Sequence, residues 1–255
     1  MIFEVVPGAA GSPVILHVPH AARAITRAAR RSLLVGDDAL ADELDQLTDA
    51  YTDRIAAGAA GRAVPRPWIF ENRWSRLVVD PERFPDEREE MRAAGMGAVY
   101  THGYAGRKLR DSDAGELLTT HYFPYADGLA ALVGDRVTAT GRALIVDVHS
   151  YPSVALPYEL HGDGPRPPVC LGTDEFHTPP ELVAAAADAF GAVGLNTPFA
   201  GCYVPLDRYR RDRRVTALMV EIRRDTYLTE PAGEPHDGLD RLAAALAALV
   251  TAASL

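Results

Sequence analysis

Cysteine is scarce in this sequence, and several familiar catalytic signatures are missing. The two cysteines, Cys170 and Cys202, form no CxxC pair and are too few for a disulfide framework, so neither a thiolate zinc site nor a redox dithiol is indicated. Cys202 has no basic neighbour in sequence, which favours an ordinary loop cysteine over a nucleophile. The sequence also lacks a GxSxG elbow, a P-loop, a GxGxxG segment after a strand and an HEXXH pair.

A basic excess and long apolar runs are absent as well. Lys and Arg number 26 against 35 Asp and Glu, which gives a formal net charge of −9. Nucleic-acid-binding proteins normally show a basic stripe, so no nucleic-acid partner is expected. No charge-free apolar run reaches the ~18 residues of a membrane span, and no basic region precedes the short apolar stretch near the N-terminus. The sequence therefore predicts a cytoplasmic protein without a membrane partner, and it leaves open whether the chain forms a homo-oligomer.

The 255 residues fit one domain, 1–255, in which short apolar segments alternate with longer helical patterns. That alternation is typical of an α/β sheet covered by helices. Four runs rich in Val, Ile and Leu predict buried strands at residues 14–18, 77–79, 144–148 and 217–222. Helical patterns cover residues 38–58, 122–138, 180–192 and 238–253, with Asp38 as N-cap of the first and Pro180 in the first turn of the third. Long loops, which often carry function, are expected over residues 61–75, 81–112, 151–179 and 197–214.

Ionisable side chains follow all four predicted strands. They are His20 after the first, Asp80 and Arg83 after the second, His149 after the third and Glu221 at the end of the last. Each has an ordinary structural explanation on its own, but placing several charges at one sheet edge is costly unless they serve each other. In open α/β sheets the site lies beyond the carboxyl ends of the strands. The pattern therefore predicts a metal or acid–base site at that edge.

The two histidines of HVPH are expected to play different roles. Residues three apart on a strand point to opposite faces, and Pro19 blocks the helical alternative, so His17 and His20 should not both bind one metal. His20 lies at the strand exit and is the better ligand, whereas His17 is expected to be packed or hydrogen-bonded within the sheet. Asp147 and His149 share a face of the third strand, which makes Asp147 a supporting group for a ligand at His149.

A third ligand candidate comes from the first predicted helix. Asp45, Asp49 and Asp53 recur every four residues, which stacks three carboxylates on one helix face unless water or a cation relieves the repulsion. Asp45 and Asp53 are interpreted as a solvated helix face. Two histidines, one carboxylate and an open position make up the pattern of a catalytic zinc site, and Glu221 could then act as the base for water.

Arginines complete the candidate site. Arg76 and Arg83 flank the second predicted strand, and guanidinium groups there can hold a substrate carboxylate in bidentate fashion. Arg223 and Arg224 follow Glu221. An arginine-rich mouth on an acidic protein favours a small anionic substrate. The remaining arginines are interpreted as surface residues: Arg66, Arg73, Arg107, Arg110 and those within residues 208–214.

Short motifs follow one another along the chain: VPHAAR, TDAYTD, SRLVVDPER, VDVHSYPS, NTPFAGCYVP and VEIRRDTYL. Together they resemble the N-formylglutamate amidohydrolase (deformylase) family over about residues 14–230, a family related to the zinc carboxypeptidases and to aspartoacylase. The resemblance implies a three-layer α/β/α sandwich with a mostly parallel or mixed central sheet and one zinc ion (Zn2+). By motif position His20, Asp49 and His149 would be the zinc ligands, with Asp80 and Asp147 behind them.

The same resemblance implies roles for residues around the ion. Glu221 stands where the related carboxypeptidases carry their general base, and Arg76 resembles the arginine that polarises the scissile carbonyl. Arg83 resembles the arginine that clamps a substrate carboxylate. Arg223 and Tyr203 are further substrate-binding candidates.

Three positions depart from the family pattern. Ala22 replaces a usual glycine, Glu82 replaces the asparagine of a D-L-N-R segment, and Ala126 replaces the histidine of a P-Y-H segment. An acidic group at position 82 would repel a glutamate-like substrate if it faced the pocket.

The expected function is zinc-dependent hydrolysis of the amide bond of a small N-acyl amino acid, N-formyl-L-glutamate or a similar compound. A zinc peptidase or cell-wall amidase acting on a larger substrate is an alternative, as is a non-catalytic binding protein on the same fold. The presence of His20, His149 and Glu221 together argues against the binding protein, because a relic has no physical need for all three.

Overall fold

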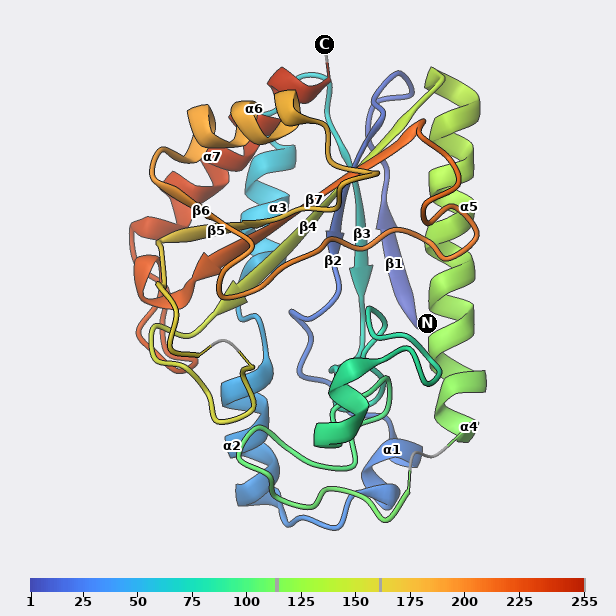
Figure 1. The fold of residues 1–255 in the computed structure, drawn as a ribbon, viewed down its shortest axis with the longest axis vertical. Helices are drawn as coiled ribbons and strands as arrows, with labels where there is room; N and C mark the ends of the chain where they lie inside the picture. The colour runs from blue at the N-terminus through green and yellow to red at the C-terminus, as the bar shows by residue number, and fades with distance from the viewer. Residues whose placement is uncertain (113–114, 161, 255) are drawn as a thin grey trace.

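A seven-stranded mixed sheet forms the centre of the protein (Figure 1). The structure, a computed structural model, describes residues 1–112, 115–160 and 162–254. In sheet order the strands are β1 (Phe3–Val6), β3 (Trp68–Asn72), β2 (Val14–Val18), β4 (Ala143–Tyr151), β7 (Val215–Arg223), β5 (Val169–Gly172) and β6 (Val193–Leu195). β3, β2, β4 and β7 are parallel to one another, whereas β1 is antiparallel to β3 and β5 to β7. The mixed central sheet is therefore confirmed.

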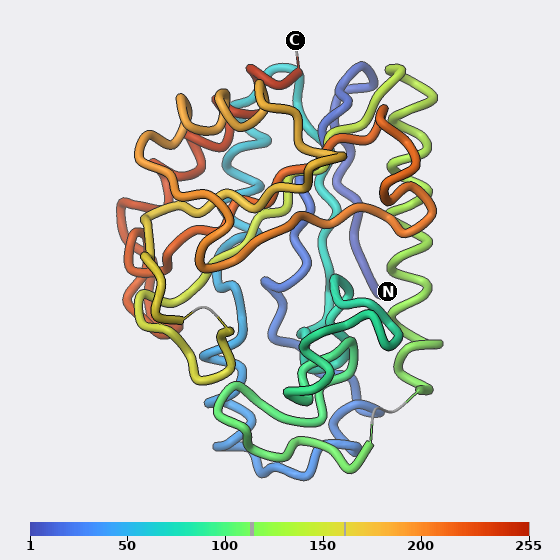
Figure 2. Tube along the Cα trace, viewed as in Figure 1, coloured from blue at the N-terminus to red at the C-terminus, as the bar shows by residue number. Residues whose placement is uncertain are grey.

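Helices cover both faces of this sheet, as Figures 1 and 2 show. One face carries α3 (Thr52–Ala60), α6 (Pro180–Phe190) and α7 (Gly238–Ala253), and the other carries α5 (Phe123–Thr140). Successive β2 side chains point to opposite faces: Leu16 packs in the core that includes Leu246 of α7, whereas Ile15 packs in the core that includes Leu129 of α5. The architecture is the three-layer α/β/α sandwich that the sequence predicts.

The other helical segments are short. They are α1 (Arg27–Ser32), α2 (Asp37–Leu47), α4 (Gly115–Leu117), a π-helical turn (Leu118–Tyr122) and two 3-10 helices (Glu90–Ala94 and Arg224–Thr226). α1 and α2 lie with the loop of residues 73–112 at the lower end of the view in Figure 1, where Leu47, Leu77 and Tyr100 belong to one buried cluster. Among the helices of the described residues, none is both long and apolar enough to cross a membrane.

Three of the four predicted strands are confirmed, and the second is wrong. Residues 14–18 match β2, and the predicted strands at 144–148 and 217–222 lie within β4 and β7. Residues 77 and 78 instead belong to a turn, in which the Val78 amide donates to the Ser75 carbonyl at 2.8 Å, and Val79 follows it. These residues are apolar because they are buried. A short apolar run does not tell a buried loop segment from a buried strand. β3 and β5 occupy parts of the expected loops 61–75 and 151–179, and residue 161 of the latter lies outside the described residues.

The helices differ from prediction mainly at one position. The expected helix 38–58 is two helices, α2 and α3, separated at residues 48–51, and its N-cap is Gly36 and not Asp38. The break reflects tertiary contacts that outweigh helix propensity. The expected helices at 122–138, 180–192 and 238–253 correspond to α5, α6 and α7, with Pro180 in the first turn of α6 as predicted.

Candidate active site

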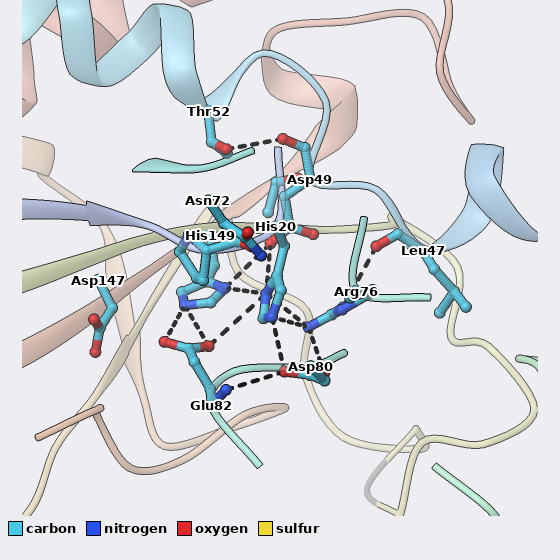
Figure 3. A network of polar contacts seen from close by, with 12 residues as sticks. His20, Leu47, Asp49, Thr52, Asn72, Arg76, Asp80, Glu82, Asp147 and His149 are labelled. Atoms are coloured by element: carbon cyan, nitrogen blue, oxygen red, sulfur yellow. Dashed lines mark hydrogen bonds and ion pairs between the residues drawn. The ribbon is translucent and has the colours of Figure 1, made fainter. Parts of the chain in front are cut away.

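Three side chains from distant parts of the chain meet beyond the carboxyl end of β2 (Figure 3). His20 follows β2, Asp49 lies between α2 and α3, and His149 is near the end of β4. His20 Nδ1 is 3.3 Å from His149 Nδ1, Asp49 Oδ2 is 3.1 Å from His149 Nδ1, and the same oxygen is 3.6 Å from His20 Nδ1. Zinc ligands in a tetrahedral site lie about 3.3 Å apart, because the zinc–nitrogen distance is about 2.0–2.1 Å. These three atoms therefore have the spacing of a zinc ligand set.

Main-chain contacts place Asp49 in this triangle. The Asp49 amide donates to the His20 carbonyl at 3.0 Å, and the Tyr227 hydroxyl donates to the Ala50 carbonyl at 2.7 Å. Tyr51 adopts a left-handed backbone conformation with φ of 66°, after which α3 begins. Asp49 is thus removed from the helical face that the four-residue spacing with Asp45 predicts, and its carboxylate points to the histidines.

Each of the two histidines also contacts a carboxylate through its other ring nitrogen. His20 Nε2 is 2.9 Å from Asp80 Oδ1, and His149 Nε2 is 3.1 Å from Glu82 Oε2. In both residues Nδ1 is the nitrogen that faces the triangle. With a metal bound there, a carboxylate at Nε2 would keep the proton on Nε2 and leave Nδ1 free to coordinate. The sequence predicts such a supporting role for Asp80 but not for Glu82.

Asp80 connects the site to a buried polar network. Its Oδ2 accepts a hydrogen bond from the Tyr100 hydroxyl at 2.6 Å and lies 3.3 Å from an Arg76 nitrogen and 3.7 Å from Arg83 Nε. Burial on its own raises the pKa of Asp80, but His20 and the two arginines hold it well below its usual range. Asp80 is therefore a fixed anion behind His20.

The turn that carries Arg76 and Asp80 is held by an arginine that the sequence analysis assigns to the surface. Arg110 is buried, and its guanidinium donates to the carbonyls of Leu77 and Tyr100. Burial lowers the pKa of Arg110 to about 10. The surface interpretation is wrong because the turn exposes main-chain carbonyls to the protein interior, where they need donors.

Glu221 lies beside His149. In the parallel pair of β4 and β7 these two residues are opposite each other, so their side chains share a face of the sheet. Glu221 is buried, and its Oε2 has no hydrogen-bond partner among the described residues. Burial raises the pKa of Glu221 to about 7, against the lowering effect of His149. A buried carboxyl group with a free oxygen and a pKa near neutrality can exchange a proton with a ligand.

Arg76 lies over His20. One of its terminal nitrogens is 2.7 Å from His20 Nδ1, and its other terminal nitrogen donates to the Leu47 carbonyl at 3.4 Å. Its Nε is buried without a hydrogen-bond partner among the described residues. The guanidinium therefore presents donors at the ligand triangle.

Arg224 is a further member of the site for which the sequence analysis gives no role. It begins the 3-10 helix after β7, is buried, and donates to Asp49 Oδ1 at 3.3 Å, to Ser150 Oγ at 3.2 Å and to the Gln46 carbonyl at 2.6 Å. Its neighbour Arg223, the predicted substrate-binding residue, turns outward and donates to Asp225 Oδ1 at 2.7 Å. Strand alternation would place Arg223, two residues after Glu221, on the face of the site. Because a 3-10 helix begins at Arg224, it is Arg224 that reaches Asp49.

A second group of acidic and histidine side chains lies next to the first: His17, Glu82 and Asp147. His17 Nδ1 is 2.7 Å from Asp147 Oδ1, and His17 Nε2 is 2.6 Å from the Tyr125 hydroxyl. These bonds confirm the prediction that His17 is hydrogen-bonded within the sheet. Asp147 contacts His17 and the Tyr203 amide, at 2.6 Å, so it reaches the site through His17 and not through His149.

The donor set fits a metal cation. Burial on its own lowers the pKa of His149, but Glu82 and Asp49, one at each ring nitrogen, raise it well above its usual value. The carboxylates around His149 therefore favour a positive charge at the ligand triangle. Two imidazole nitrogens and one carboxylate oxygen at tetrahedral spacing, with the free oxygen of Glu221 close by, are the donors that zinc prefers.

Comparisons with known proteins identify the family and the fold. A family model described as N-formylglutamate amidohydrolase matches residues 12–228. The crystal structure of N-formylglutamate amidohydrolase from Ralstonia eutropha JMP134 superposes with a TM-score of 0.82 at 20% identity, covering 99% of this chain and 97% of that chain. The structure of a gene product from Agrobacterium tumefaciens superposes with a TM-score of 0.65 at 20% identity, covering 88% of this chain and 86% of that one. These structures share the fold.

Among curated proteins, none matches this sequence. The family model spans both histidines, Asp49 and Glu221, and therefore the whole of the candidate site as well as most of the chain. The chain belongs to the N-formylglutamate amidohydrolase family.

Proposed function

We propose that this protein hydrolyses the amide bond of a small N-acyl amino acid, N-formyl-L-glutamate or a similar compound, with one zinc ion held by His20, Asp49 and His149. The observation that carries the proposal is the ligand triangle with the buried, unpartnered oxygen of Glu221 beside it. Family membership supports an amide as the bond that is cleaved. Bound zinc supplies a Lewis acid that acidifies water and polarises a carbonyl oxygen.

Glu221 acts as the general base and then as the acid. Its carboxylate takes a proton from water that attacks the acyl carbon, and it returns the proton to the departing amine. The pKa of about 7 that burial gives Glu221 suits both halves of this exchange near neutral pH. Its place on β7, opposite His149, puts the exchange next to the ligand triangle.

Arg76 stabilises the negative charge that develops on the carbonyl oxygen. Its guanidinium is fixed by Asp80 and by the Leu47 carbonyl, so it needs no reorganisation during the reaction. A single well-placed donor of this kind contributes about 2.7–4 kcal/mol to transition-state stabilisation. Arg83 and Tyr203 lie beside the site and are assigned to substrate binding, whereas Arg223 is turned away from it.

Glu221→Gln tests the proposal. The variant keeps the size of the side chain but removes the base, so turnover should fall to background while about one zinc per chain remains bound. Glu175→Gln makes the same chemical change at an exposed position and should leave activity unchanged. The assay is a hydrolysis screen of N-formyl, N-acetyl and N-succinyl amino acids and of short peptides with zinc-loaded protein. Full activity of Glu221→Gln would refute its role, and cleavage of peptides alone would favour a zinc peptidase.

A further inference from the structure

Glu82 is the most accessible carboxylate in contact with the site histidines. Its side chain is 17% exposed, whereas those of Asp49 and Asp80 are at most 3% exposed. Its Oε2 is 3.1 Å from His149 Nε2 and 3.8 Å from His20 Nδ1. Figure 3 shows it on the side of the histidines opposite to Asp49. A ligand that reaches the histidines from solvent therefore meets the carboxylate of Glu82.

Glu82 is also fixed in place. Its amide donates to Asp80 Oδ1 at 3.2 Å, which holds the main chain, and its carboxylate contacts His149, His20 and His17. These contacts hold the carboxylate of Glu82 at the accessible side of the ligand triangle.

The arginines nearby already face acidic groups of the same chain. Arg83 lies 3.7 Å from Asp80 Oδ2 and 3.5 Å from Glu89 Oε1. Arg224 faces Asp49, and Arg223 faces Asp225 outside the site. Arg83 and Arg223, the two expected clamps for a substrate carboxylate, are thus each engaged by an internal carboxylate.

The formal charges of the site leave no positive surplus for a dianion. Five carboxylates and three guanidinium groups surround the histidines: Asp49, Asp80, Glu82, Asp147, Glu221, Arg76, Arg83 and Arg224. With all of these carboxylates and guanidinium groups ionised and the histidines neutral, one divalent cation brings the charges into balance. A substrate with two carboxylates then adds uncompensated negative charge close to Glu82, and like charges at short range in a poorly hydrated site repel strongly.

We propose that Glu82 directs this site toward N-acyl amino acids whose side chain ends in a neutral or cationic group, and away from N-formyl-L-glutamate. The inference rests on the proposed amide hydrolysis and names the substrate class of the same site. Its physical content is a fixed negative charge at the accessible side of the ligand triangle, with the neighbouring cations already neutralised.

The test compares substrates that differ only in the charge of the side chain. Initial rates with N-formyl-L-glutamate, N-formyl-L-glutamine and Nα-formyl-L-lysine give kcat/KM for the zinc-loaded wild type, for Glu82→Gln and for the exposed control Glu175→Gln. The wild type should prefer the glutamine compound over the glutamate compound by about tenfold or more, the discrimination expected from like charges several ångströms apart. Glu82→Gln should reduce that ratio by about the same factor, mainly through KM, and Glu175→Gln should not change it.

Binding of the deacylated products supplies a readout that needs no turnover. Calorimetry should show tighter binding of L-glutamine than of L-glutamate to the wild type, and a smaller difference in Glu82→Gln. The wild-type ratios and affinities decide the question even if Glu82→Gln fails to fold. A wild type that prefers the glutamate compound, or a ratio that Glu82→Gln leaves unchanged, overturns the inference while hydrolysis itself stands. If a folded, zinc-loaded wild type hydrolyses no N-acyl amino acid, the proposed function fails and the inference fails with it.

Discussion

Asp80→Asn removes the carboxylate that links His20 to Arg76 and Arg83, and its effects can be worked out from the contacts. An asparagine oxygen can still accept from His20 Nε2, now 2.9 Å from Asp80 Oδ1, but it carries no charge. Loss of a carboxylate behind a histidine ligand weakens metal binding by about 10–100-fold. We therefore expect the zinc dissociation constant to rise by that factor, which is about 1.4–2.8 kcal/mol.

The same substitution leaves Arg76 and Arg83 without their shared partner. Asp80 is fully buried and lies 3.3 Å from Arg76 and 3.7 Å from Arg83. Breaking a buried ion pair on one side costs about 3–5 kcal/mol, and the lower end applies here because Arg83 is partly exposed and also faces Glu89. We expect the free energy of unfolding of the metal-free protein to fall by about 3 kcal/mol.

Two assays measure these effects separately. Competition with a chelating dye gives the zinc affinity, and urea unfolding of the metal-free protein gives the stability. Asp45→Asn is the matched control, because Asp45 forms an exposed pair with Arg23 at 2.6 Å and should change stability by less than about 1 kcal/mol with no effect on zinc. Wild-type zinc affinity in a correctly folded Asp80→Asn protein would refute the supporting role assigned to Asp80.

Two further predictions concern stability away from the zinc ligands. Glu43 is buried, and burial raises its pKa above 4.5, so ionisation of its carboxyl group opposes folding. In urea unfolding, Glu43→Gln should therefore become progressively more stable than the wild type as the pH rises from about 4.5 through the raised pKa. A difference in stability that does not change with pH would contradict this. Gly172→Ala would place a Cβ 2.1 Å from the Gly201 carbonyl oxygen, so the midpoint of urea unfolding should fall by the equivalent of about 1–3 kcal/mol. Gly11→Ala meets open space and should be neutral; equal effects of the two substitutions would rule out the steric reason.

The sequence predicts the parts of the fold that depend on local pattern. Fully buried strands such as residues 14–18 and the long amphipathic helix at 238–253 are visible as continuous apolar runs or as helical periodicity. The carboxyl ends of parallel strands meet at one edge, so His20, His149 and Glu221 can be brought together from their places at or near the ends of strands.

The rest depends on contacts between distant segments. Asp49 leaves the helical pattern because its amide bonds to the His20 carbonyl, and no neighbouring residue signals that break. Asp80 is predicted correctly near the site but for the wrong reason, since it follows a buried turn and not a strand. Arg110 resembles other loop arginines in sequence, and only the turn that it supports explains its burial.

The main-chain bond between Asp49 and His20 has a consequence for ion selectivity. The bond ties the segment that carries His20 directly to the segment that carries Asp49. The donor atoms of these two residues and of His149 are therefore held at the spacing that a small ion such as zinc requires, before any metal binds. Calcium takes six to eight oxygen donors at about 2.3–2.6 Å, and a cage of two nitrogens and one oxygen offers neither that number nor that radius. The protein should therefore discriminate against the commoner hard cations by size and donor type before any substrate arrives.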